Sequence, residues 1–287
     1  MTERLPDLSQ VQSNVLRGFR THEALPLLRY VFLSFSNTKT IRRWLSATRS
    51  EVTCCPDWDR LAAADDKSKA YIWNVGFTYA GMKLLGLPDE PSPPGEVDPI
   101  ECTVPEVSPF QDQAAFVQGA ALRGAARLGD TGDSAPDKWD EPFKTGGIHA
   151  VVSLAAWTAT GLDAAAGVLA ASVKKARGTT VLGTEDGSAI PGPTGMEHFG
   201  FVDGIGQPYV EGSGLEEYPG EGAPVKGGWR PIKPGEFVLG YEDETQRTLH
   251  NTDLLRHGSY LVFRKLHQDV AGFRTYTQQA ADAMRGD

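Results

Sequence analysis

LLRYVFLSF, residues 27–35, is the stretch of sequence that decides the fold. Apolar, aromatic and β-branched residues dominate it, which is typical of a buried β-strand. The next segment, 38–48, has apolar residues at helical spacing, and AYIWNVGF at 70–77 predicts a second strand. Residues 78–85 then predict a short helix. A strand, helix, strand, helix order with short links indicates α/β or α+β packing.

The segments that follow complete one domain. Alanine-rich helices are expected at 113–127 and 161–177, and strands are expected at 147–156 and 179–183. We therefore predict a compact α+β domain of four strands and flanking helices over residues 1–184.

The character of the sequence changes after residue 184. Residues 185–250 are rich in glycine and proline, and loops of this length in a folded protein are usually functional or disordered. Aromatic residues spaced along this region favour an ordered, functional loop. A strand at 259–266 and a helix at about 269–284 come next, so residues 251–287 are interpreted as the first strand and helix of a second, incomplete domain.

The composition excludes two classes of partner. The chain has 287 residues, and 28 Lys and Arg against 37 Asp and Glu give a net charge of −9. Nucleic acids and anionic membrane surfaces are both bound by clustered basic residues, so we expect neither as a partner. No stretch approaches the ~18 consecutive apolar residues that span a bilayer.

The N-terminus and the cysteines indicate the cytoplasm. The first seven residues, MTERLPD, lack the apolar core of a signal peptide. Cys54, Cys55 and Cys102 are too few for a disulfide framework and lack the CxxC spacing of a zinc site. Sparse thiols are typical of a reducing compartment, and no residue is assigned as a metal ligand.

The stretch EHFGFVDGIGQP, residues 197–208, is the strongest candidate for a functional site. Asp203 lies here between Gly200 and Gly204, and glycine lets a backbone approach a flat ligand because it lacks a Cβ. Apolar neighbours would partly desolvate Asp203 and raise its pKa, which suits a carboxyl group to proton transfer near neutral pH. The same pattern also fits an Asx turn, in which the Asp203 side chain only bonds its own backbone.

This stretch resembles the GxxDG signature of the dye-decolourising (DyP-type) haem peroxidases, and the resemblance runs from about residue 7 to the end of the chain. One GxxDG is a weak signal, but six blocks in the family's order are a strong one. The other five blocks are DLSQVQSNVLRGF from Asp7, NVGFTYAGMKLLGLP from Asn74, ARLGD from Ala126, GEFVLGY from Gly235 and GSYLVFRKL from Gly258.

The resemblance implies an α+β, ferredoxin-like (dimeric α+β barrel-type) domain with an antiparallel sheet, the start of a second similar domain, and haem b between the two halves. Asp203 stands where the family has its distal aspartate, which takes a proton from hydrogen peroxide and returns it to the outer oxygen. The implied partners are hydrogen peroxide and an organic electron donor such as a dye or a phenol, and a homo-oligomer is suggested. The residues expected to contact haem are His198, Gly200, Phe201, Val202, Gly204 and Ile205.

The sequence also departs from the family pattern. The family's proximal haem histidine and distal arginine lie beyond the block that begins at Gly258, and the chain reaches Asp287 before either of them. Haem iron needs an axial protein ligand, so the site would be incomplete and the chain would be a fragment of a longer protein. The six histidines, none of which matches the proximal position, are His22, His149, His198, His250, His257 and His267.

Three functions fit these residues. The first is a haem peroxidase, or the N-terminal part of one, with Asp203 as its acid–base group. The second is a truncated, non-catalytic module that binds a porphyrin or another partner. The third is an acid–base enzyme without haem, which pairs Asp203 with Glu185 or Asp186. The acidic run 242–244 is expected to be a solvated face or a structural turn. Aromatic residues that would either relay electrons or simply pack are Trp73, Trp157, Trp229, Tyr209 and Tyr260.

Overall fold

The computed structural model describes residues 5–17, 25–87, 114–123, 127–144, 146–192, 196–202, 208–216, 221–248 and 254–285. Its strands are β1 (Leu27–Phe35), β2 (Tyr71–Phe77), β3 (Ala150–Ala156), β4 (Thr179–Ser188), β5 (Ala223–Val225) and β6 (Gly228–Arg230). Its α-helices are α1 (Ser13–Leu16), α2 (Thr38–Thr48), α3 (Cys55–Ala62), α4 (Tyr79–Leu85), α5 (Ala114–Arg123), α6 (Ala159–Lys175) and α7 (Val270–Arg285). Short 3-10 turns lie at Arg49–Glu51, Gly132–Ser134, Pro136–Lys138 and Pro234–Glu236.

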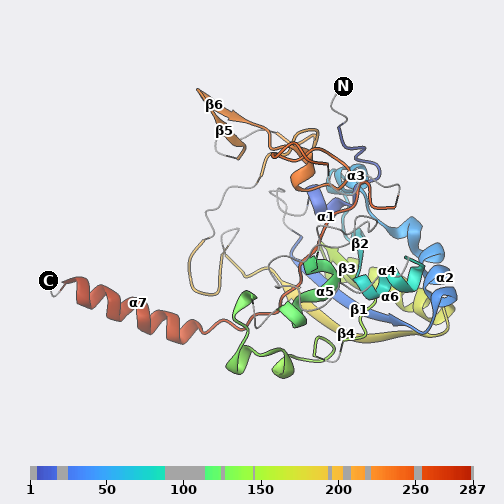
Figure 1. Ribbon diagram of the computed structural model, residues 1–287, viewed down its shortest axis with the longest axis horizontal. Coiled ribbons are helices and arrows are strands. Elements are labelled where there is room, and N and C mark those ends of the chain that lie inside the picture. The colour runs from blue at the N-terminus through green and yellow to red at the C-terminus, as the bar shows by residue number, and fades with distance from the viewer. Residues whose placement is uncertain are drawn as a thin grey trace, which may run out of the picture.

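The first four strands form one antiparallel sheet in the order β2-β3-β1-β4 (Figure 1). Helix α2 follows β1, and helix α6 connects β3 to β4. This arrangement is ferredoxin-like, so the expected α+β class with an antiparallel sheet is confirmed. None of the helices in the described ranges has both the length and the apolar character needed to cross a bilayer.

The main core lies between the sheet and helices α2 and α6. Alternate residues of a strand point to the same face, and Val31, Leu33 and Phe35 of β1 are all buried on the helix side. Trp44 of α2 is fully buried among them and donates from Nε1 to the Oγ of Ser172 in α6 at 3.1 Å. This hydrogen bond ties the two covering helices together.

Side-chain caps explain where these helices begin. Asn37, Thr78 and Thr158 each precede a helix and accept a hydrogen bond from the backbone N–H three residues later, as N-cap residues do. Helix α4 also lies directly against the strand that follows. A Cβ at Gly81 would meet the His149 carbonyl oxygen at 1.9 Å, so only glycine fits there.

Two segments hydrogen-bond the outer backbone of β2. The Gln12 side chain donates to Val75 O at 2.9 Å and accepts from Val75 N–H at 2.8 Å. Thr53 forms a similar pair of hydrogen bonds with Trp73. Its backbone N–H donates to Trp73 O at 2.8 Å, and its Oγ1 accepts from the Trp73 N–H at 3.0 Å. The entry turn before α1 is thereby attached to the sheet.

Strand β4 is longer than the sequence predicts. It continues past the expected end at Gly183 to Ser188, because its last residues pair with Leu27 to Tyr30 of β1. Arg29 also donates two hydrogen bonds to the Asp186 carboxylate, at 2.6 and 2.8 Å. The expected domain boundary after residue 184 therefore falls inside a strand, while the division into domains itself stays a prediction.

Three other elements differ from the expectation. Helix α5 is interrupted at Gly119, whose φ of +74° is not helical. Helix α3 and the β5–β6 pair have no counterpart in the sequence prediction. Cys54, which is not a usual cap residue, stands at the N-cap of helix α3. The Asp57 carboxylate accepts a hydrogen bond from the Cys54 N–H.

The predicted strand Ser259–Leu266 is wrong. The segment has no strand pairing within the described part of the chain, because an extended run becomes a strand only where another backbone hydrogen-bonds to it. Side chains hold it instead: Arg264 pairs with the buried Asp130 at 2.7 Å, and Lys265 pairs with Asp140 and Glu185 at 2.9 and 3.0 Å. The helix predicted after it is present as α7.

Candidate functional site

Residues 196–202 form a small hairpin that leads directly into Asp203. Its two end residues make an antiparallel bridge, and the Glu197 N–H donates to Phe201 O at 2.8 Å. The Gly200 N–H donates to Glu197 O at 2.9 Å, and Gly200 has a φ of +93°, which glycine adopts without strain. The first glycine of the signature is therefore required by the turn.

This 196–202 hairpin presents apolar side chains to solvent. Phe201 is 62% exposed and Val202 is 50% exposed, and His198 and Gly200 are also exposed. The structure thus brings together four of the seven expected site residues. The other three, Asp203, Gly204 and Ile205, lie outside the described residues, so the desolvation and raised pKa expected for Asp203 stay predictions.

An aromatic residue from far along the chain packs on the hairpin. The ring centroid of Phe273, in the first turn of α7, lies 4.6 Å from that of Phe199 and 5.9 Å from that of Phe201. The sequence interpretation missed Phe273, because its local pattern is that of any amphipathic helix. Only the fold brings residue 273 beside residues 199 and 201.

The described histidines have other contacts or face solvent. His149 Nδ1 accepts from the Phe35 N–H at 2.9 Å, and partial burial lowers its pKa. His257 Nδ1 lies 3.0 Å from the hydroxyl of Tyr241. His198 and His267 are exposed. Within the described ranges no group of three or more His, Cys, Asp or Glu side chains is placed to hold a metal ion.

The two acids considered as partners of Asp203 are engaged in ion pairs. Asp186 is held by Arg29, whose hydrogen bonds lower the pKa of that carboxyl group. Glu185 accepts from Lys265 at 3.0 Å. Both contacts fasten β4 to its neighbours, which accounts for these acids without an acid–base role.

The aromatic residues considered for electron relay divide by environment. Trp73 is fully buried in the main core. The ring centroid of Trp157 lies 6.2 Å from that of Trp58 in a smaller cluster. Trp229 is 43% exposed on β6. Tyr209 and Tyr260 are partly buried, and burial raises the pKa of Tyr260. Packing accounts for Trp73 and Trp157, while Trp229 is open to solvent.

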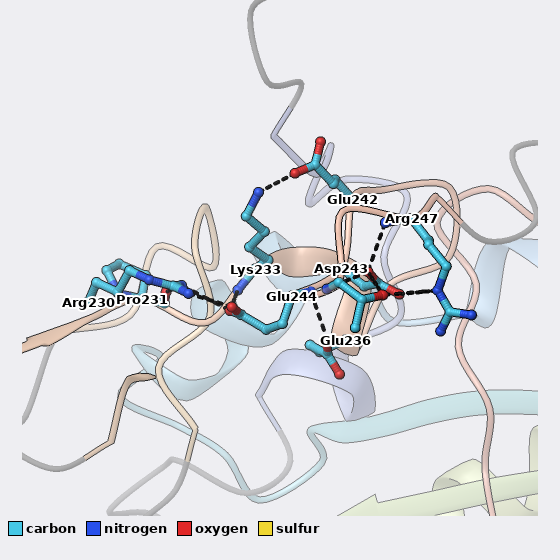
Figure 2. A network of polar contacts seen from close by, with 9 residues as sticks. Arg230, Pro231, Lys233, Glu236, Glu242, Asp243, Glu244 and Arg247 are labelled. Carbon is cyan, nitrogen blue, oxygen red and sulfur yellow. Dashed lines mark hydrogen bonds and ion pairs between the residues drawn. The ribbon is translucent and has the colours of Figure 1, made fainter. Parts of the chain in front are cut away.

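The acidic run 242–244 is a structural turn and not a solvated face. Asp243 is 6% exposed and accepts from the Thr245 N–H at 2.8 Å. It also accepts from the Arg247 N–H at 2.9 Å (Figure 2). Such an Asx arrangement satisfies the turn's own backbone. The hydrogen bond from the Arg247 N–H, followed by that from the Thr245 hydroxyl, lowers the pKa of Asp243.

Glu244 connects this turn to the residues before it. It forms an ion pair with Arg230 and accepts from the Lys233 N–H at 2.8 Å, while Lys233 also pairs with Glu242 (Figure 2). The hydrogen bond from Arg230, with that from Lys233, lowers the pKa of Glu244 to about 2. An open cavity of about 410 Å³ beside it is lined by Ala223, Ile232, Glu236, Phe237 and Glu244, none of them a residue of the hairpin.

The ferredoxin-like fold and the 196–202 hairpin, with Gly200 in its turn, together define a class. The family described as "DyP dimeric alpha+beta barrel domain" matches residues 10–182, more than half of the chain. The chain belongs to this family, that of the dye-decolourising peroxidases.

Relatives with curated names agree with this assignment. A dye-decolorizing peroxidase of Mycena epipterygia is 26% identical over 273 residues, which cover 94% of this chain and 43% of the relative. The multifunctional dye peroxidase DyP2 of Amycolatopsis is 28% identical over 298 residues, which cover 98% of this chain and 54% of the relative. The chain therefore spans about half the length of the curated relatives it matches.

Solved structures support the fold. An ancestral D-type dye decolorizing peroxidase superposes with a TM-score of 0.73 at 26% identity, over 96% of this chain and 53% of that one. A dye-decolorizing peroxidase in complex with 2,6-dimethoxyphenol gives a TM-score of 0.69 at 24% identity, over 95% of this chain and 52% of that one.

The described residues fit one side of a haem and not the other. Peroxidases of this family bind haem, a flat and largely apolar group. The 196–202 hairpin offers exposed apolar surface and a glycine with no Cβ, which suits contact with a haem face. An axial ligand is also required, and the contacts of the four described histidines assign none of them to that position.

Proposed function

We propose that this chain supplies the peroxide-facing side of a haem-dependent peroxidase that oxidises dyes, phenols and other organic donors with hydrogen peroxide. Family membership, combined with the exposed 196–202 hairpin that leads into Asp203, carries the proposal. The names of the relatives support an organic dye as electron donor. The proposed cofactor is haem b.

Asp203 is the acid–base group in this proposal. Its carboxylate takes a proton from hydrogen peroxide and returns it, a task that a positioned carboxyl group performs best when its pKa lies near the working pH. Gly200 and Gly204 allow the backbone to lie close to the flat cofactor. The side chains proposed to contact the cofactor are His198, Phe201, Val202 and Ile205.

Titration of the full chain with haemin tests the proposal. A shifted Soret band and peroxide-dependent dye oxidation are expected for the native sequence. Asp203→Asn keeps the shape of the side chain but removes the base, and it should lower the oxidation rate by about 100-fold or more while the Soret band remains. Asp163→Asn, an exposed change on α6, is the matched control and should keep full activity. Equal rates for the two variants would contradict the role of Asp203.

The alternative function is a module that binds a porphyrin, or another partner, without turning over peroxide. The same titration separates the two functions, because this module would show a Soret shift and no dye oxidation. Absence of any Soret shift would contradict haem binding by this chain.

We also propose a cytoplasmic location and a homo-oligomer. Cys54 and Cys55 are free thiols, which supports a reducing compartment. Cell fractionation tests the location. Light scattering tests the assembly, and a mass of one chain at micromolar concentration would exclude the homo-oligomer.

A further inference from the structure

Helix α7 reaches the hairpin only with its first turn. Asp269 starts the helix by accepting the Gly272 N–H at 2.8 Å on its side chain and the Phe273 N–H at 3.0 Å on its carbonyl. Phe273 is therefore fixed at the docked end, and the helix extends away from the sheet from there (Figure 1).

The partly buried residues of α7 lie on the side of the helix that bears Phe273. Val270, Phe273 and Ala281 are partly covered and recur at helical spacing. Tyr276, about one turn further along the helix, is 70% exposed. The rings that Phe273 meets belong to Phe199 and Phe201, more than 70 positions earlier in the chain.

The described contacts within the hairpin are few. Two backbone hydrogen bonds and one bridge close residues 196–202 on themselves, and an isolated two-stranded hairpin is only marginally stable in water. Phe201 is 62% exposed and Val202 is 50% exposed. The ring contacts with Phe273 therefore add to the few described contacts that order residues 199–202.

We propose that Phe273 is a positioning residue, which holds the 199–202 backbone, and with it the proposed haem contacts Phe201 and Val202, in one arrangement. The importance of that arrangement rests on the proposed function. The coupling between α7 and the hairpin is a property of this chain alone and can be measured without haem.

Hydrogen exchange by mass spectrometry on the full, haem-free chain measures this coupling. Phe273→Ala removes both ring contacts, and Ala is a better helix former than Phe, so α7 itself is not weakened. Exchange at residues 197–202 should rise about tenfold, while exchange at residues 277–285 stays unchanged. Tyr276→Ala is the matched control on the same helix and should leave the hairpin unchanged.

A double mutant and a conservative variant complete the test. Phe199→Ala with Phe273→Ala should raise exchange no more than the larger single change, because residues that act through one contact are not additive. Phe273→Tyr keeps the ring and should restore slow exchange. Unchanged exchange in Phe273→Ala, or an equal rise across the hairpin and α7, would overturn the proposal.

These outcomes are independent of the proposed function. Failure of the native chain to bind haemin would reject the peroxidase and leave the hairpin coupling intact. If haemin binds, Phe273→Ala should change the Soret band, whereas Tyr276→Ala should not. Coupling without such a change would reject Phe273 as a positioning residue for the proposed haem contacts.

Discussion

Phe263→Ala, in the extended segment Ser259–Leu266, should lower the free energy of unfolding of the chain. The Phe263 ring lies 5.0 Å from Tyr30, 5.1 Å from Phe32 and 5.3 Å from Phe143, measured between centroids. These three partners lie on the face of the sheet opposite α2 and α6, or against it. Phe263 therefore covers part of the sheet face that lies opposite α2 and α6.

The magnitude follows from burial and ring contacts. Truncation of a fully buried Phe to Ala costs about 3–5 kcal/mol, and each aromatic pair contributes about 0.5–1.5 kcal/mol beyond its buried area. Phe263 is only partly buried, but its loss would also uncover Phe32, which is 2% exposed. We expect a loss of about 2–3 kcal/mol in the free energy of unfolding.

Urea unfolding followed by far-UV circular dichroism measures this loss. Val262→Ala is the matched control, because Val262 is the adjacent residue and is 79% exposed. It should change stability by less than about 0.5 kcal/mol. Equal losses for the two variants, or a loss below about 0.5 kcal/mol for Phe263→Ala, would show that the segment does not cover the sheet in solution.

Two further predictions concern polar contacts. Glu244 has a pKa lowered from 4.5 to about 2 in the folded chain, so its contribution to stability is present above pH 4.5 and is lost as the pH falls toward 2. Urea midpoints of the native chain should therefore fall more steeply over this range than those of Glu244→Gln, and parallel curves would contradict the pairing with Arg230. Ser172→Ala removes the acceptor of the buried Trp44 Nε1 and should cost about 1–3 kcal/mol in urea unfolding, whereas the exposed Ser46→Ala in α2 should cost almost nothing. Similar values for both serine variants would contradict the bond between α2 and α6.

The elements predicted well are those whose signals are local. Residues 27–35 and 38–48 carry strand and helix patterns within their own sequence, and the structure has β1 and α2 at those positions. The sequence of elements indicates α/β or α+β packing, and the resemblance to the family implies the ferredoxin-like order. Thr78 and Thr158 are likewise local signals, since each caps the helix that starts just after it.

The elements predicted badly depend on distant partners. Glu185 to Ser188 have weak strand propensity, and only pairing with β1 makes them part of β4. Ser259–Leu266 has strong strand propensity but finds no backbone partner among the described residues. A sequence pattern reports what a segment would form and not whether a partner is present.

One feature of the candidate site could be predicted from its local sequence, and another could not. The position of Gly200 in a turn is encoded locally, and the hairpin shows the positive φ that requires it. Phe273 and its ring contacts depend on two segments far apart in sequence, so no pattern within either segment marks them.

The hydrogen bonds on the outer side of β2 also bear on association between copies of the chain. An edge strand with free N–H and C=O groups is a template on which another protein can add a strand, and this is a common route to aggregation. In β2 the groups of Trp73 and Val75 that a foreign strand would need are already bonded to Thr53 and Gln12. The Gln12 carboxamide, together with the hydroxyl and backbone N–H of Thr53, thus takes the place of a neighbouring strand. The centre of this edge is closed to intermolecular strand addition.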